Sequence, residues 1–255
     1  MKLEKIPNHQ LKNYLAGVGA VGVLSRYVCQ KKALESSFAV LNGAEIVGVA
    51  ISGLPLGLPE AYSWWVFGEN GQVVQLLAEA LETEPTFINF PVEYLDIFRA
   101  AYPEGEFSWD RLYVLNASQF KDVGTLEPEF RIERLFTPNL QKLKFGREIK
   151  SALGPLEDWD ETAQLYGVVE NGVELVAIAE MMVQDEAGNA TIQQVYTVEK
   201  RRSRGLGRKL VGSISRILLE QGKIPSYLVS ETNPASIKLV ESLGFEMASR
   251  WGYLE

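Results

Sequence analysis

The stretch Arg202-Ser203-Arg204-Gly205-Leu206-Gly207 combines basic side chains with two closely spaced glycines. Such a turn suits a pyrophosphate, because arginine supplies positive charge and glycine lets a ligand oxygen approach the backbone. An apolar run, 195–198, precedes it, and a helical pattern with apolar positions from Leu210 to Leu218 follows. The first turn of that helix would offer backbone N–H groups and the positive end of the helix dipole. The sequence therefore predicts an anion-binding strand–turn–helix unit.

The turn resembles the acyl-CoA-binding signature of the GNAT N-acetyltransferase superfamily, in which Gln or Arg is followed by two residues, Gly, one residue, and Gly or Ala. Arg202, Gly205 and Gly207 fit this pattern. Residues 233–245 resemble a second signature of the superfamily, a helix that begins with Asn and ends in Gly-Phe. Two ordered motifs at this separation are more specific than either alone. Residues 195–207 look most like the glycine N-acyltransferase-like branch.

The resemblance implies direct transfer of an acyl group from acyl-CoA, in the simplest case acetyl-CoA, to an amine. It implies that the pantetheine arm lies along the strand and the phosphates on the turn. The residues expected to bind the co-substrate are Tyr196, Thr197, Val198, Arg202, Ser203, Arg204, Gly205, Leu206, Gly207 and Arg208, together with Asn233 and Ser236. Asn233 and Ser236 have an alternative role as caps of the helix that they begin.

Acyl transfer needs a base for the acceptor ammonium and a proton for the leaving thiolate. Glu180 is the candidate base, because its strand is expected to pair with the co-substrate strand; a carboxylate that only meets solvent or a cation is the alternative. Many superfamily members have Tyr where this chain has Val240, and Val donates no proton. Tyr196 is therefore a candidate catalytic donor, with Tyr253, Ser236 and water as alternatives.

The composition excludes several other chemistries. The chain has one cysteine, Cys29, and one histidine, His9, so a Cys/His zinc site and an internal disulfide are ruled out, and no metal cofactor is expected. The net charge of -8 argues against nucleic acid as the main partner. No apolar run is long enough to span a bilayer, and Met1–Lys5 does not lead into a signal-peptide core. We therefore expect a cytoplasmic protein with no membrane partner.

Residues 1 to about 36 are expected to be helical with interruptions. They contain Gly17-Val18-Gly19-Ala20-Val21-Gly22, which fits the dinucleotide-binding pattern. That pattern requires a preceding buried strand, whereas residues 10–16 are polar and not strand-like. A small-residue bend between helices is the favoured interpretation, and a dinucleotide-dependent enzyme is the weaker one.

The two halves of the chain show the same order of expected elements. The strands expected in the first half are 38–42, 45–52, 62–67, 86–90 and 109–115, with helices at 73–81 and 94–100; those in the second half are 165–169, 174–183, 190–198, 227–230 and 245–254, with helices after 207 and 233. A shift of 129 residues maps Asn42 to Asn171, Gly43 to Gly172, Glu45 to Glu174, Val47 to Val176 and Ala50 to Ala179. This match predicts an internal repeat rather than a coincidence of element order.

We therefore expect an α/β (α+β) protein of two tandem GNAT-like domains, each a mixed central sheet flanked by helices. The domains are predicted at 1–126 and 130–255, with 127–129 as linker. The first copy is predicted to be degenerate, because its turn Gly68-Glu69-Asn70-Gly71 has no arginine and Glu69 would repel a phosphate.

The predicted function is N-acyl transfer, with a small amine, an amino acid or a peptide N-terminus as acceptor. A non-catalytic acyl-CoA-binding module is the alternative. The acceptor, the acyl chain length and the oligomeric state are left open at this point.

Overall fold

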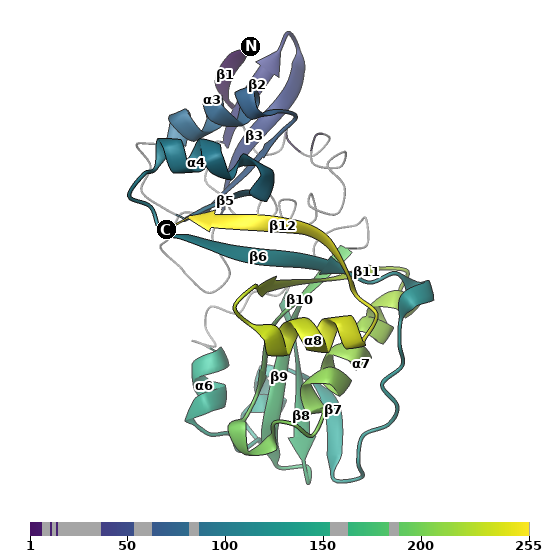
Figure 1. Cartoon of the computed structure of the whole chain (residues 1–255). Coiled ribbons are helices and arrows are strands. Elements are labelled where there is room, and N and C mark those ends of the chain that lie inside the picture. Colours follow the sequence, from purple (N-terminus) through teal and green to yellow (C-terminus); the bar gives the residue numbers. More distant parts are fainter. Residues whose placement is uncertain are drawn as a thin grey trace. The chain divides into compact units, whose positions relative to one another are not determined.

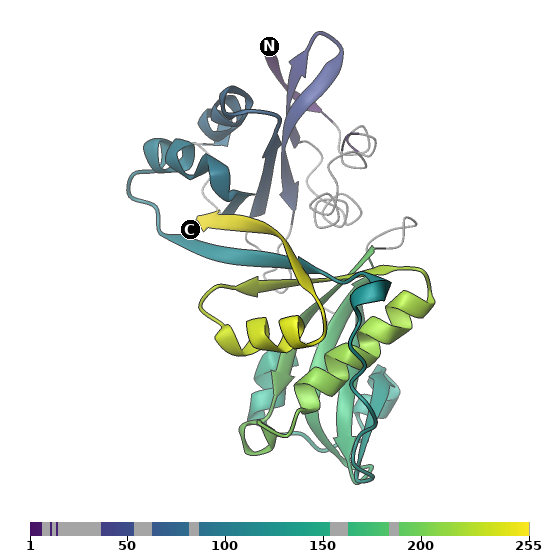
Figure 2. The same cartoon turned by 45° about the vertical axis from the view of Figure 1, so that its right-hand side comes forward.

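The computed structural model describes residues 1–6, 11, 14, 37–53, 63–81, 87–153, 163–183 and 189–254. Contacts divide the chain into two compact units (Figures 1 and 2). Unit 1 contains Met1–Leu112, Ser230–Thr232 and Ala248–Glu255, and unit 2 contains Tyr113–Val229 and Asn233–Met247. Unit 1 thus includes both ends of the chain. The predicted domains 1–126 and 130–255 cut the chain only once, and their boundaries stay a prediction.

Unit 1 is built on strands in the order β1-β2-β3-β4-β5-β12. Its elements are β1 (Lys2–Ile6), β2 (Ser37–Asn42), β3 (Glu45–Gly53), β4 (Ser63–Gly68), α3 (Gly71–Leu81), β5 (Phe87–Pro91), the 3-10 turn η3 (Val92–Tyr94), α4 (Leu95–Ala101), most of β6 (Phe107–Val114) and the second part of β12 (Glu246–Leu254). Helix α3 buries Val73, Val74, Leu77, Ala78 and Leu81, which recur at helical spacing and pack on the strands. Helix α4 adds Phe98, whose ring stacks on that of Phe90 at 4.0 Å.

Unit 2 is built on strands in the order β7-β8-β9-β10-β11, with helices on both faces (Figure 1). Its elements are the 3-10 turn η4 (Ala117–Gln119), β7 (Phe130–Leu135), α5 (Thr137–Leu140), α6 (Arg147–Leu153), β8 (Ala163–Glu170), β9 (Glu174–Val183), β10 (Asn189–Thr197), η6 (Glu199–Arg201), α7 (Leu206–Glu220), β11 (Ile224–Ser230) except its last residue, and α8 (Pro234–Ser242). Helix α7 covers one face with Leu210, Val211, Ile214 and Leu218. Ile149 and Leu153 of α6 pack on the other face.

The two units repeat one pattern, which confirms the tandem fold predicted from the sequence. In each, an antiparallel hairpin is followed by a strand that pairs antiparallel with the hairpin on one side and parallel with the next strand on the other. The hairpins even share a bulge: Val47 is skipped between the pairs Val40–Gly48 and Leu41–Ile46, and Val176 between Val168–Ala177 and Val169–Leu175. Val47 and Val176 are related by the 129-residue shift.

The turns of both hairpins have the backbone conformation that the sequence predicts. Gly43 has φ +67°, and Asn171 and Gly172 have φ +50° and +72°. These left-handed conformations suit glycine and asparagine, which explains Gly43 in the first turn and the Asn171-Gly172 pair in the second. Local turn chemistry was therefore a sound guide to the two hairpins.

The N-terminal segment differs from its prediction. Lys2–Ile6, expected to be helical, forms strand β1 and pairs antiparallel with β2 from Lys2–Leu41 to Ile6–Ser37. The reason is a ladder to residues far along the chain, which no local pattern reveals. The rest of the stretch 1–36, including Gly17–Gly22, lies outside the described residues apart from Leu11 and Tyr14. The elements β7, α5 and α6 were not anticipated.

The C-terminal strand was expected to close the second half of the chain, but its last residues belong to unit 1. Trp251 pairs with Pro91 and Leu254 with Ile88 in an antiparallel ladder between β12 and β5. Aromatic packing explains the preference: the ring of Trp251 lies 5.4 Å from that of Phe67. Tyr253 stacks on Phe87 at 5.3 Å. The interior that these rings complete is that of the first copy.

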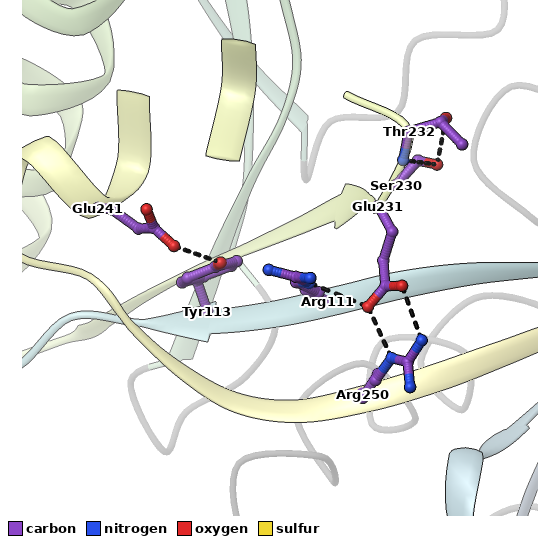
Figure 3. Close-up of polar contacts among 7 residues, drawn as sticks. All are labelled: Arg111, Tyr113, Ser230, Glu231, Thr232, Glu241 and Arg250. Atoms are coloured by element: carbon purple, nitrogen blue, oxygen red, sulfur yellow. Dashed lines mark hydrogen bonds and ion pairs between the residues drawn. The ribbon is translucent and has the colours of Figure 1, made fainter. Parts of the chain in front are cut away.

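A carboxylate between two arginines ties β12 into unit 1 (Figure 3). Arg250 donates from Nε and Nη2 to the two oxygens of Glu231 at 2.6 and 2.8 Å. Arg111 of β6 donates to Glu231 at 2.9 Å. The hydrogen bonds from Arg250, with those from Arg111, lower the pKa of Glu231 to about 2. This network holds the C-terminal strand beside β6.

Candidate functional site

Strand β10 carries an irregularity in the middle of unit 2. The antiparallel register with β9 shifts between Gln193 and Tyr196, and Gln194 adopts φ +48°. A positive φ at a residue other than glycine is strained, and bulges of this kind re-aim side chains and end strand pairing. The bulge therefore marks the place where β10 changes its neighbours.

The bulge coincides with a separation of β10 from β11, which we call the β10–β11 splay. The parallel ladder between the two strands runs from Asn189–Ile224 to Ile192–Tyr227, while β10 continues to Thr197 and β11 to Ser230. Beyond the last pair, the backbone groups of 193–197 lie outside that ladder. An extended chain of amides can therefore bond to this part of β10, as a further strand would.

The predicted anion-binding turn connects the splay to α7. Gly205 has φ +74°, a left-handed conformation that favours glycine, and no side chain caps the helix that it precedes. A Cβ on Gly207 would lie 3.3 Å from Oγ1 of Thr197 and 3.4 Å from Cδ1 of Leu239, so helix and strand approach closely there. The N–H groups of the first turn of α7 are thus presented without a side-chain competitor.

The arginines of the turn each have a partner in the chain. Arg202 donates from Nε to the carbonyl of Thr197 at 3.1 Å. Arg204 forms ion pairs with Glu127 and, at 3.1 Å, with Glu129. Arg204 is held by the two carboxylates of the predicted linker, so an incoming phosphate has to compete with them.

Arg208 has a different environment from Arg202 and Arg204. Its Nε donates to Oγ of Ser242 at 2.9 Å, and its Nη2 to the Ser242 carbonyl at 3.3 Å. These bonds tie α7 to the end of α8. They give Arg208 a positioning role besides the predicted contact with the co-substrate.

The remaining predicted binding residues lie between the end of β10 and the start of α7, except for Asn233 and Ser236, which lie at the start of α8. Val198 donates its N–H to the carbonyl of Val176 at 3.0 Å, and Ser203 has φ +62°. Leu206 is buried in the core, so only its backbone can face a ligand. Asn233 caps α8, since its Oδ1 accepts from the N–H of Ser236 at 3.1 Å. The capping alternative is thus the one that the structure shows for Asn233.

Glu180, the candidate base, lies on β9 directly opposite the bulge. It is 7% exposed, and its Oε2 accepts a hydrogen bond from Nε2 of Gln193 at 2.7 Å. It pairs with Gln193 across the two strands and shares the sheet face of Ile178, which packs towards α6. A buried carboxylate beside the bulge fits the role of a base better than that of a solvated surface group.

Tyr196 has a partner that sequence reasoning missed. Its hydroxyl donates to Oε2 of Glu148 on α6 at 2.7 Å, and the same oxygen accepts from the N–H of Glu199 at 3.1 Å. The hydrogen bond to Glu148 raises the pKa of Tyr196 and lowers that of Glu148. The hydroxyl proton of Tyr196 is thus directed to the Glu148 carboxylate. Nothing in the local sequence around Glu148 signals this contact.

Val240, at the position where many superfamily members have Tyr, is completely buried in the core of unit 2. A larger side chain there would have to displace its neighbours. A tyrosine introduced at this position to supply a proton would therefore meet a packing obstacle.

No group of three or more His, Cys, Asp and Glu side chains that could hold a metal ion is found within the part of the chain that the structure describes. Among those residues, no helix has the length and apolar character needed to cross a membrane.

Residues 165–253 match the family model described as FR47-like protein, and no curated protein sequence matches the chain. Solved structures align over nearly the whole length. A Drosophila protein does so with TM-score 0.71 and 13% identity, covering 99% of this chain and 97% of that one. A GNAT-family acetyltransferase from Colwellia psychrerythraea gives 0.63 and 14%, covering 100% and 99%. A tandem GNAT protein from the clavulanic acid biosynthesis pathway gives 0.61 and 14%, covering 99% and 98%.

The chain has the GNAT fold. This confirms the superfamily fold predicted from the turn at 202–207 and the helix at 233–245. The alignment with a tandem GNAT protein accords with the repeat seen in the two units. The family model spans the part of the GNAT fold from β8 to β12, which includes the predicted acyl-CoA turn. The glycine N-acyltransferase-like branch is not distinguished by these matches and stays a prediction.

Proposed function

We propose that this protein is an N-acyltransferase that moves an acyl group, in the simplest case acetyl, from acyl-CoA to a primary amine. The observation that carries the proposal is the junction of the β10–β11 splay with the uncapped N-terminus of α7. An extended polar arm and a pyrophosphate are the two parts of a ligand that such a junction suits.

The residues of unit 2 fit acyl-CoA. The N–H groups at the start of α7, with the side chains of Arg202 and Arg204, would hold the phosphates. The backbone of 193–197 would bond to the amides of the arm. When bound, acyl-CoA supplies the thioester that is attacked. Arg208 and Asn233 would keep α7 and α8 in place around it.

In the proposed reaction, Glu180 takes a proton from the acceptor ammonium, and Gln193 holds the carboxylate in position. Backbone N–H groups of the bulged segment of β10 stabilise the oxygen that gains charge in the transition state. The acceptor is a small amine, an amino acid or a peptide N-terminus. We place the activity in the cytoplasm, which cell fractionation would test.

The direct test is release of free thiol from acetyl-CoA and longer acyl-CoAs with a panel of amines. The wild type should release thiol only when an amine is present, and Glu180→Gln should lower kcat by about a hundredfold. The Gln side chain keeps the shape, so thermal unfolding of this variant should stay close to wild type. Thiol release that is unchanged in Glu180→Gln would remove Glu180 from the mechanism.

A non-catalytic acyl-CoA-binding module is the second candidate. It is favoured by Val240, whose side chain cannot donate a proton to the thiolate. It is also favoured by Tyr196, whose hydroxyl proton is already donated to Glu148. Tight CoA binding by calorimetry without thiol release for any amine would support this role over the enzyme.

A further inference from the structure

The proposed reaction needs a proton for the leaving sulfur, and two of the sequence candidates are already held by other residues. The hydroxyl of Tyr196 donates to Glu148. Tyr253 lies in unit 1, where its ring stacks on Phe87. The hydroxyl groups in unit 2 near the base of the splay are therefore the ones to consider.

Tyr227 of β11 stands at the base of the β10–β11 splay. It pairs with Ile192 in the last register pair of the parallel ladder, so the two strands separate directly after it. Its ring packs edge-to-face against Phe245 at 6.4 Å, and its side chain is 4% exposed. The tyrosine thus lies at the inner end of the space in which an extended ligand arm would end.

The hydroxyl of Tyr227 faces Ser236 on α8, whose side chain lowers the pKa of the tyrosine against the larger effect of burial. Ser236 lies in the first turn of α8 and is partly exposed, whereas the tyrosine is buried. Ser236 and Val240 are four residues apart and share one face of the helix. The hydroxyl of Tyr227 therefore lies at the face of α8 that also carries Val240, the position at which this chain has no proton donor.

We propose that Tyr227 donates the proton that the leaving sulfur of acyl-CoA takes, with Ser236 connecting its hydroxyl to solvent. This inference rests on the proposed function. It assigns a catalytic role to a residue on β11 that the sequence signatures do not include.

The acceptor ammonium loses two protons in the reaction. Glu180 takes the first; the amine nitrogen then forms a bond to the acyl carbon and gives its second proton to solvent. The C–S bond breaks, and its electron pair stays on sulfur. The hydroxyl proton of Tyr227 passes to sulfur and gives the free thiol. The proton that Glu180 removed from the acceptor returns to the tyrosine oxygen by way of solvent and Ser236. No oxidant or further reactant is needed.

The environment of the hydroxyl agrees with this role. Burial raises the pKa of Tyr227, so the group keeps its proton at neutral pH and is ready to donate. Tyr166 of β8 offers a matched control, because burial also raises the pKa of that tyrosine and it lies in the same core. Its hydroxyl bonds to Gln164 at 3.4 Å.

The test compares Tyr227→Phe and Tyr166→Phe in thiol release and in binding of CoA and desulfo-CoA, which lacks the sulfur. Tyr227→Phe should lower kcat by about a hundredfold with little change in KM. It should weaken CoA by several-fold and leave desulfo-CoA unchanged. Tyr166→Phe should change neither. If Tyr227→Phe misfolds, Ser236→Ala should slow kcat by about tenfold at saturating acyl-CoA, where a lost binding contact would raise KM and not lower kcat.

A kcat for Tyr227→Phe within twofold of wild type, or an equal loss of affinity for CoA and desulfo-CoA, would overturn the assignment. The binding comparison decides this without turnover, because it reports only contact with sulfur. Failure of the wild type to acylate any amine would instead contradict the proposed function. The two failures are therefore distinguishable.

Discussion

Helices α3 and α7 begin at the same place in the two repeats, but only α7 has an uncapped N-terminus. In unit 1, residues 69–70 alone connect β4 to α3, and Oδ1 of Asn70 accepts from the N–H of Val73 at 3.1 Å. In unit 2, residues 198–205 connect β10 to α7, and Gly205 provides no side-chain cap. The first copy satisfies its own helix N-terminus, while the second leaves N–H groups for a ligand.

The charged side chains near the two helix starts also differ: carboxylates gather near the start of α3, and arginines near the start of α7. A cavity of about 740 Å³ in unit 1 is lined by three carboxylates, those of Glu45, Glu69 and Glu93, and by Arg250, which is ion-paired to Glu231. Burial, with a contribution from the Glu69 charge, raises the pKa of Tyr14 beside it to about 12. The first copy therefore keeps the shape of the fold but has no arginine in the turn that corresponds to 202–208. One fold can occur twice in a chain with different side chains at the same turn.

The largest predicted effect is a loss of CoA affinity when the charge of the turn before α7 is reversed. Arg204→Glu should weaken CoA binding by at least about a hundredfold, because it puts a negative charge beside the pyrophosphate. Isothermal titration calorimetry measures the affinity and the stoichiometry, which should be one CoA per chain in the wild type.

The matched control removes the opposing charge in the other copy. Glu69→Lys should leave the stoichiometry at one, since the short turn and the Asn70 cap still leave no site at α3. A second CoA bound by this variant or by the wild type would contradict the interpretation of the first copy as degenerate. Unchanged affinity in Arg204→Glu would contradict the assignment of the turn in unit 2.

The second prediction concerns the stability that the ion pairs of Glu231 give to unit 1. Glu231 has a pKa of about 2, below its ordinary 4.5, so its stabilising contribution is present above pH 4.5 and is lost as the pH falls towards 2. Glu231→Gln should lower the stability at pH 7 by about 1–2 kcal/mol and reduce the acid-induced loss. Thermal unfolding followed between pH 2 and 7 measures both effects.

CoA binding provides the control for this variant, because the proposed CoA residues lie in unit 2. Glu231→Gln should bind CoA at pH 7 with wild-type affinity. Equal acid sensitivity of variant and wild type would show that the Arg111–Glu231–Arg250 network is not a source of the pH dependence.

The smallest predicted effect concerns the carboxylates that hold Arg204. Replacing Glu127 and Glu129 together by Gln should tighten CoA binding about threefold, because the phosphate no longer competes with two negative charges. The gain should shrink at high salt, which screens exposed charges. Weaker CoA binding in this variant would mean that the carboxylates orient Arg204 rather than compete for it.

The sequence by itself determined the features that depend on neighbouring residues. Asn-Gly pairs predicted both hairpin turns, and the spacing of Arg202, Gly205 and Gly207 predicted the turn before α7. The 129-residue shift predicted the repeat, which the shared bulge at Val47 and Val176 supports. These signals are legible because turn conformation, helix starts and side-chain alternation are set within a few residues.

Only the tertiary structure decided which distant groups meet. Glu148 binds Tyr196 from 48 residues away, and Glu129 binds Arg204 from 75 residues away. Strand β1 pairs with β2, and the end of β12 pairs with β5 of the first copy. The alternation of a strand tells which face is apolar but not which strand edge it joins, since any free edge offers the same backbone groups. That choice depended on whether a complementary surface, such as the rings that surround Trp251, was present in the folded chain.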